Sequence, residues 1–274
     1  MIFDNHIHLQ TSGKNIEAVK IFEREGGTHI NICNVPLQGN DYNDLYYEKV
    51  YNETLRLVAE INAKTTIAAY ATIGPYPVDL IEALNRGMSF DKAITIMKNG
   101  IDLAVKLVEQ QKAIAIGEVG RPHFPVSESL WSQFNALILY IFEAVRDIDG
   151  AVVMHTEFTS ETMREIAVIA DQAKFKKEKI VKHYAPPLIR EDENFGIFPS
   201  VIASRKNVRE AFKKGTRFFL ETDYVDDLKN PNFVLAIDTV PKRVKMAISE
   251  GLIGMEKLSD SIIKNVHDVY NLDI

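Results

Sequence analysis

The sequence has one cysteine, no long hydrophobic run and no excess of positive charge, and each shortage excludes a class of protein. A single cysteine, Cys33, cannot form an intrachain disulfide, which excludes a disulfide-stapled secreted domain. No apolar stretch approaches the roughly 20 residues that a membrane-spanning helix needs. Asp4 and two histidines interrupt the N-terminal run that a signal peptide would require. These features predict a cytoplasmic protein without a membrane partner.

The balance of charge argues against an extended nucleic-acid-binding surface. The net charge is −6, whereas such surfaces neutralise phosphates with lysine and arginine. The most concentrated basic segment, 174–179, precedes a predicted strand and would lie at the end of a barrel opposite to the catalytic face. The charge argues only against an extended nucleic-acid surface, and it leaves a small molecule or the end of a nucleic acid open as the partner. The sequence leaves the oligomeric state open.

Short apolar runs alternate with longer amphipathic segments along the chain. One such segment carries Ile94, Met97, Ile101 and Val105 at helical spacing, which predicts a helix packed on a core. The short runs predict eight strands, at 2–8, 28–35, 66–73, 113–118, 151–155, 179–183, 200–204 and 217–223.

Strands that alternate with helices predict an α/β fold with a parallel sheet and right-handed crossovers. Eight such units in 274 residues predict a (β/α)8 TIM barrel, with 1–274 as a single domain. A doubly wound open sheet is the alternative. It is weakened because no Gly-x-Gly-x-x-Gly follows the first strand, so a dinucleotide-binding version is disfavoured.

Two histidines, His6 and His8, stand at the end of the first predicted strand. Alternate residues of a strand point to the same face, so both imidazoles can be directed at one point in space. Imidazole is the commonest metal ligand among side chains. The pair therefore indicates half of a metal site, although two partly exposed histidines in a hairpin would show the same spacing.

Four later strands also end in a side chain that can bind a metal. The carboxyl ends of the strands of a TIM barrel meet at one rim, where catalytic groups lie. Packing of a hydrophobic core does not require ionisable side chains at the ends of several strands. We therefore expect convergence of His6 and His8 with the four further residues, Glu118, His155, His183 and Asp223.

These motifs, in this order, carry a resemblance to a known family: His6-Ile7-His8, Gly117-Glu118-Val119-Gly120, the single histidines His155 and His183, and Glu221-Thr222-Asp223. The chain resembles the TatD-like branch of the metal-dependent amidohydrolase superfamily, and more narrowly its predicted archaeal-type hydrolases. The order and rough spacing hold to about residue 225. The resemblance implies a TIM-barrel hydrolase with a binuclear metal centre.

The resemblance also implies a role for each ligand. His6 and His8 would bind one metal, His155 and His183 a second, and Glu118 would bridge the two. Asp223 would contact the first metal and the nucleophilic water, and would act as the catalytic general base. Mixed histidine and carboxylate ligands suit Zn, Mn, Co, Ni or Fe better than an all-oxygen calcium site. One or two divalent ions are expected, with Mg retained among the candidates.

Three short segments depart from the familiar TatD nucleases. His155-Thr156-Glu157 stands where they tend to have His-x-Arg, and His183-Tyr184-Ala185 stands where they often have His-Cys-Phe. Gly120-Arg121-Pro122-His123 replaces their Gly-Leu-Asp. The departures leave the expected metal ligands intact but affect positions that lie near the substrate in the family.

Three residues in these segments are candidate substrate-binding residues. Arg121 carries a guanidinium that matches phosphate or carboxylate, and His123 follows it closely. Tyr184 offers a ring that can stack on a substrate. The alternatives are a surface arginine in a proline-rich loop and a packing role for the tyrosine.

The predicted function is divalent-metal-dependent hydrolysis with a metal-activated water. A phosphoester substrate of the TatD deoxyribonuclease or phosphodiesterase type is the first expectation. Hydrolysis of a lactone, amide or carboxylic ester is the alternative, because the same chemistry serves both classes. A metal-binding barrel without turnover is the alternative from another class.

Overall fold

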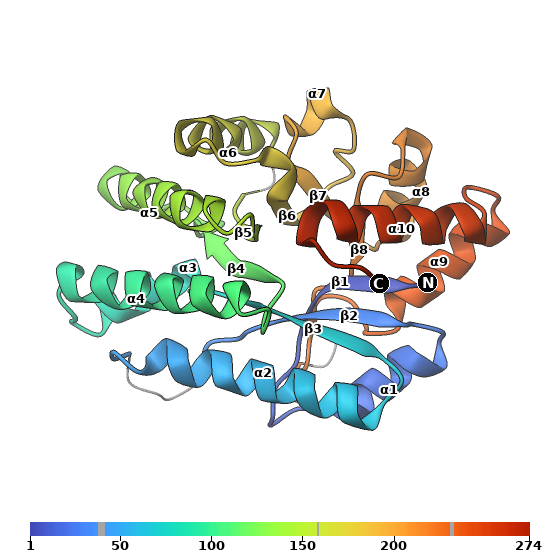
Figure 1. Ribbon diagram of the computed structural model, residues 1–274, viewed down its shortest axis with the longest axis horizontal. Helices are drawn as coiled ribbons and strands as arrows, with labels where there is room; N and C mark the ends of the chain where they lie inside the picture. Colours follow the sequence, from blue (N-terminus) through green and yellow to red (C-terminus); the bar gives the residue numbers. More distant parts are fainter. Residues whose placement is uncertain (38–41, 158, 231–232) are drawn as a thin grey trace.

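The strands form one parallel sheet in the computed structural model (Figure 1). The structure describes residues 1–37, 42–157, 159–230 and 233–274. Neighbouring strands follow the order β8-β7-β6-β5-β4-β3-β2-β1-β9. The strands are β1 Phe3–His8, β2 His29–Cys33, β3 Ala68–Ile73, β4 Ala115–Gly120, β5 Ala151–His155, β6 Ile180–Ala185, β7 Phe198–Ile202, β8 Phe219–Glu221 and β9 Tyr224–Val225.

The last strands close the sheet against the first. β8 pairs with β7, and β9 pairs with β1 on the other side. Between them, the Asp223 amide donates a hydrogen bond to the His6 carbonyl at 3.0 Å, and the Asp226 amide donates one to the His8 carbonyl at 2.9 Å. The sheet therefore curls round on itself, and the predicted (β/α)8 barrel is confirmed.

Most predicted strands differ from the observed ones by one or two residues at an end, and the largest difference is at the last strand. β7 begins two residues before the predicted 200–204. Where one strand is predicted over 217–223, the structure has β8 and, beyond Asp223, the separate short strand β9. The division has a local cause, because Asp223 has φ 50°, in the left-handed region that interrupts an extended chain. The chain forms strand hydrogen bonds again at Tyr224, now with β1 instead of β7.

Helices surround the sheet (Figure 1). Several begin at residues whose hydroxyl caps the first turn, as Ser127 does by accepting a hydrogen bond from the Leu130 amide. No helix in the described part of the chain is both long and apolar enough to cross a bilayer. The α-helices are α1 Ile16–Arg24, α2 Tyr46–Lys64, α3 Pro77–Asn85, α4 Phe90–Glu109, α5 Glu128–Arg146, α6 Ser160–Ala173, α7 Glu191–Asn194, α8 Arg205–Lys214, α9 Thr239–Ser249 and α10 Met255–Tyr270, with a 3-10 turn, η1, at Lys177–Lys179.

Helix α10 packs on apolar side chains of the strands and forms a floor below the rim. Its Val266, Val269 and Tyr270 are buried with Phe3 and Phe219 in one apolar cluster. The Tyr270 hydroxyl donates a hydrogen bond of 2.8 Å to the side-chain oxygen of Asn5 on β1. The lower part of the barrel is therefore packed, which leaves the carboxyl ends of the strands for chemistry.

A buried carboxyl group near the start of α3 links stability to pH. Burial raises the pKa of Asp79 from 3.8 to about 7, and the Tyr47 hydroxyl donates a hydrogen bond to it at 3.1 Å. Between these two values the folded state keeps a proton that the unfolded state releases. This contribution to stability is complete below the unfolded pKa and is lost as pH rises through the folded pKa.

We expect Asp79→Asn to remove this pH dependence. The fall in the free energy of unfolding from about pH 4 to about pH 7.5 should shrink by on the order of 2–4 kcal/mol, at about 1.4 kcal/mol per pKa unit. Urea unfolding at the two pH values measures it. Asp44→Asn, at an exposed position, is the control and should leave the fall unchanged. Equal falls in wild type and Asp79→Asn would contradict the assignment.

Candidate metal centre

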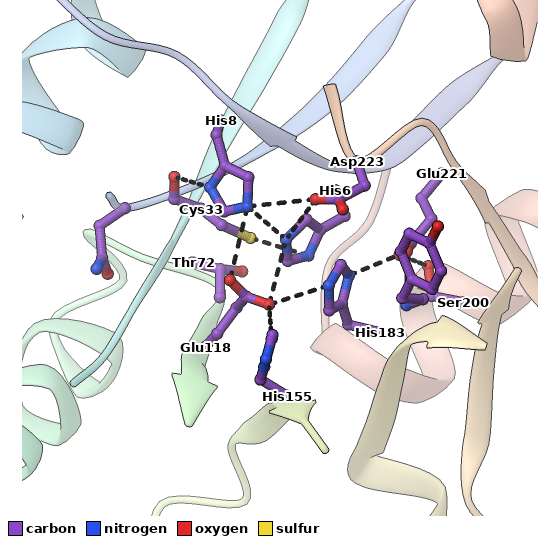
Figure 2. A network of polar contacts seen from close by, with 12 residues as sticks. His6, His8, Cys33, Thr72, Glu118, His155, His183, Ser200, Glu221 and Asp223 are labelled. Carbon is purple, nitrogen blue, oxygen red and sulfur yellow. Dashed lines mark hydrogen bonds and ion pairs between the residues drawn. The ribbon is translucent and has the colours of Figure 1, made fainter. Parts of the chain in front are cut away.

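Five strand ends bring together the six predicted metal ligands at the rim of the barrel (Figure 2). β1 supplies two of them, and β4, β5 and β6 supply one each. The sixth comes from the turn between β8 and β9. The residues are His6, His8, Glu118, His155, His183 and Asp223.

The two histidines of β1 face each other across one point. The Nε2 atoms of His6 and His8 lie 3.1 Å apart, as the strand alternation predicted. Asp223 Oδ1 lies 3.4 Å from His8 Nε2 and 3.9 Å from His6 Nε2. The positive φ of Asp223 turns its side chain back toward β1, so these three residues form one candidate ligand group.

Glu118 occupies the middle of the cluster. Its Oε1 lies 3.1 Å from both His155 Nδ1 and His183 Nε2, and 3.7 Å from His6 Nε2. Its Oε2 lies 3.6 Å from His8 Nε2. One carboxylate therefore reaches all four histidines, which is the position a bridging ligand requires.

The ligand atoms form two overlapping groups rather than two separate pairs. Those of His6, Glu118 and His183 lie within 4.8 Å of one another, as do those of His6, His8 and Asp223. His155 belongs to neither group and joins the cluster through Glu118. The expected pair of His6 and His8 is therefore grouped with Asp223, as the resemblance implies. His183, which was expected to pair with His155, is grouped with His6 instead.

Cys33, the last residue of β2, contacts the Nδ1 atoms of both β1 histidines. The Nδ1–H of His8 donates to the Cys33 carbonyl at 3.2 Å, and Cys33 Sγ lies 3.2 Å from His6 Nδ1. A bond at Nδ1 directs the Nε2 lone pair of His8 at the cluster. Burial raises the pKa of the thiol well above its usual value, which favours the neutral thiol over the nucleophilic thiolate.

Each of the other two histidines has a polar neighbour at the ring nitrogen that points away from Glu118. His183 Nδ1 lies 2.9 Å from Glu221 Oε1, and His155 Nε2 lies 3.0 Å from His123 Nδ1. Glu221 is fully buried and also accepts a hydrogen bond from the Tyr184 amide at 2.6 Å. Sequence reasoning quoted Glu221 in a motif without giving it a role. Its place at the carboxyl end of β8, two residues before Asp223, was the available signal.

The shifted pKa values of Glu118 and His6 favour the protonation states in which these side chains bind a metal. Burial raises the pKa of Glu118, but His183, His6 and His155 outweigh it and hold that pKa well below the usual value. Burial and the neighbouring His183 keep the pKa of His6 well below its usual value. An ionised carboxylate and a neutral imidazole are the forms that bind metals.

His8 and His183 differ from His6 and His155, because the pKa of each is raised: burial lowers the pKa of His8, but Asp223 and Glu118 outweigh it. His183 has the larger rise. Burial lowers its pKa, but Glu221 and Glu118 outweigh burial and raise that pKa to about 9. A metal ion bound at the Nε2 atom of His183 would displace the proton that this raised pKa retains on the ring. The donor atoms, their burial and their charges therefore fit a divalent cation. The candidate ligands that lie close enough to share one are His6, His8, Glu118, His183 and Asp223.

A cavity of about 490 Å³ opens above the cluster. Two of the three predicted substrate-binding residues, His123 and Tyr184, line it. Tyr184 has φ 52°, so its backbone turns directly after His183. Both side chains are therefore within reach of a molecule bound at the cluster.

The third, Arg121, is turned away from the cavity. Its side chain is fully buried and donates to Glu165 at 2.8 Å, to Glu157 at 3.1 Å and to Asn135 at 3.1 Å. Its guanidinium also lies 4.0 Å from the Trp131 ring centroid. The expectation that Arg121 binds an anionic substrate is not supported by this placement, because both terminal nitrogens of its guanidinium donate within the protein and the group does not line the cavity.

Arg121 ties together the segments that carry Glu118 and His155. We expect Arg121→Lys to lower the free energy of unfolding by about 2–4 kcal/mol, because a lysine cannot span two carboxylates and an amide at once. Urea unfolding measures the loss. Arg164→Lys, in an exposed ion pair with Glu161, is the control and should change little. If Arg121→Lys kept the stability of the wild type and showed a raised KM for an anionic substrate, the interpretation of Arg121 as a substrate-binding residue would be restored.

Comparison with known proteins agrees with this geometry. The family described as TatD related DNase matches residues 3–271. The chain belongs to this family. An uncharacterized protein of Methanocaldococcus jannaschii is 36% identical over 278 residues, an alignment that covers 100% of this chain and 96% of that protein. The TatD resemblance seen in the sequence is confirmed.

Solved structures of TatD proteins share the fold. The TatD homologue YJJV from Escherichia coli K12 is similar with a TM-score of 0.68 and 14% identity, over 99% of this chain and 98% of that one. A TatD-like protein from Archaeoglobus fulgidus gives 0.60 and 15%, over 97% and 99%. The phosphotriesterase homology protein from Escherichia coli, solved with phosphate in its active site, gives 0.62 and 11%, over 98% of each chain. As a member of the TatD family, the protein is a hydrolase.

Proposed function

We propose that the protein hydrolyses an ester with a water molecule activated at the cluster of His6, His8, Glu118, His155, His183 and Asp223. The observation that carries the proposal is the position of Glu118, whose two oxygens lie within 3.7 Å of all four histidines. Divalent ions held there would acidify water and withdraw charge from the attacked group.

Asp223 is the general base in this proposal. Its side chain is 14% exposed and lines the cavity, so it can reach a water molecule beside a bound substrate. It takes a proton from the water as the water oxygen bonds to the electrophilic phosphorus or carbonyl carbon. The leaving oxygen keeps the electron pair of the broken bond and then receives that proton.

A phosphoester substrate remains the prediction from sequence. It is supported by the name of the family and by the phosphate in the active site of the structurally similar phosphotriesterase homology protein. A carboxylic ester or lactone is the second candidate. It is favoured by the cavity, whose walls include Val35, Pro36 and Val225.

Metal-reconstituted protein should hydrolyse bis(p-nitrophenyl) phosphate, a 3′-ended single-stranded DNA or a member of a small lactone panel. Chelation should abolish that activity and readdition of metal should restore it. Full activity in chelated protein would refute the metal requirement. Stoichiometric metal without turnover on any of these substrates would favour the metal-binding barrel.

A further inference from the structure

The cavity above the metal cluster has apolar walls. Val35 and Pro36 contribute from the segment after β2, Val225 from β9, and Phe233 and Val234 from the segment that follows it. Phe233 is 76% exposed although it lines the cavity, so its ring stands at the entrance. Ligand-binding cavities are lined mainly by apolar and aromatic side chains, so these walls together suit an apolar group of a ligand.

The charges in the cavity are those of the cluster itself. Its described lining contains the carboxylates of Glu118 and Asp223 and no lysine or arginine. The positions outside the described residues, 38–41, 158 and 231–232, are neither lysine nor arginine in the sequence. Arg121, which follows the Glu118 strand, is held by Glu157 and Glu165.

Such a cavity discriminates between substrates by charge. A nucleic acid carries phosphates on both sides of the bond to be cut, and proteins bind them with arginine, lysine and amide groups. Here those flanking phosphates would meet valine, proline and phenylalanine side chains and lose hydration without an ion pair. An uncharged apolar group gains by burial on the same walls. The volume of about 490 Å³ suits a small molecule.

We propose that the substrate is a small uncharged ester with an apolar group, rather than a nucleic acid or another anionic phosphoester. The proposal rests on the proposed hydrolase function and adds the charge and polarity of the substrate. Its reacting centre is a carboxylic ester or a phosphotriester, which share these properties. The Phe233 ring covers the apolar group at the entrance.

Four esters with one leaving group test the proposal. They are p-nitrophenyl butyrate, diethyl p-nitrophenyl phosphate, the singly charged ethyl p-nitrophenyl phosphate and the doubly charged p-nitrophenyl phosphate. Each kcat/KM is divided by the rate constant of hydroxide-catalysed hydrolysis, which removes differences in intrinsic reactivity. We expect the neutral pair to exceed the charged pair by roughly a hundredfold, with the butyrate and the triester showing which centre is used.

A charge placed at the entrance should shift this preference. Phe233→Lys should raise the ratio of charged diester to neutral triester roughly tenfold. Val168→Lys puts the same charge on the exposed face of α6, outside the cavity lining, and should leave the ratio unchanged. Equal shifts in both variants, or no shift in either, would overturn the role of the entrance.

Binding gives a second measurement. Metal-loaded Asp223→Asn protein should show no saturable binding of a fluorescent single-stranded oligonucleotide at physiological salt. Saturable binding, or a wild-type preference for the charged esters that is lost in Asp223→Asn, would overturn this proposal and leave the hydrolase function standing. Wild-type rates on all four esters equal to those of chelated protein would overturn both.

Discussion

Asp223→Asn should lower kcat by about 10²–10⁴-fold while leaving most of the bound metal in place. Asparagine keeps the shape of the side chain and one oxygen that can bind a metal, but it cannot accept the proton of the attacking water. The Asp223 amide bond to the His6 carbonyl at 3.0 Å involves the backbone and should survive the change.

Steady-state kinetics and metal analysis of the same preparation check this result. Asp227→Asn is the matched control, because its carboxylate binds the Lys229 amide and Asn230 at the surface and does not line the cavity. An active Asp223→Asn enzyme would remove Asp223 from proton transfer. An inactive variant that has also lost its metal would show that the residue acts mainly as a ligand.

Glu118→Gln should abolish activity and reduce metal binding together. The carboxylate lies 3.1 Å from a nitrogen of both His155 and His183, so its loss removes the negative charge shared by the whole cluster. The glutamine has nearly the same volume, so the core around it need not repack. We expect kcat to fall at least about 10³-fold and metal affinity at least about 10-fold.

Thermal unfolding separates loss of metal from loss of fold. Metal that binds only the folded state raises stability, by about 2.7 kcal/mol at one hundred times Kd. Wild-type protein and the control Glu109→Gln, at the exposed end of α4, should show this rise in Tm on metal addition. Glu118→Gln should fold yet show little of it. A full rise in the variant would contradict the bridging assignment.

The six candidate ligands could be predicted because their geometry follows from chain-local rules. His6 and His8 share a face through the two-residue repeat of a strand. Glu118, His155 and His183 lie on parallel strands, whose carboxyl ends meet at one rim whatever the detailed packing. The order of these residues along the chain then suffices to place them together.

The partners of the ligands could not be predicted in the same way. Cys33 contacts His6 across β1 and β2, and Glu221 contacts His183 across strands separated by β7. Such contacts depend on the stagger between strands and on side-chain rotamers, which apolar periodicity does not reveal. Arg121 shows the same limit, because the loop after β4 sends its guanidinium between α5 and α6, to Asn135 and Glu165.

The sequence by itself determined the barrel, and it predicted the rim that carries the site and the six candidate metal-binding side chains that the structure brings together there. These depend on hydrophobic periodicity and on the last residue of each strand, which are local properties of the chain. Only the tertiary structure decided the inward turn of Asp223, the burial of Arg121 and the apolar walls formed by Val35 and Phe233. Those depend on how segments remote in sequence pack against one another, because a side chain's direction in a loop is set by its neighbours in space.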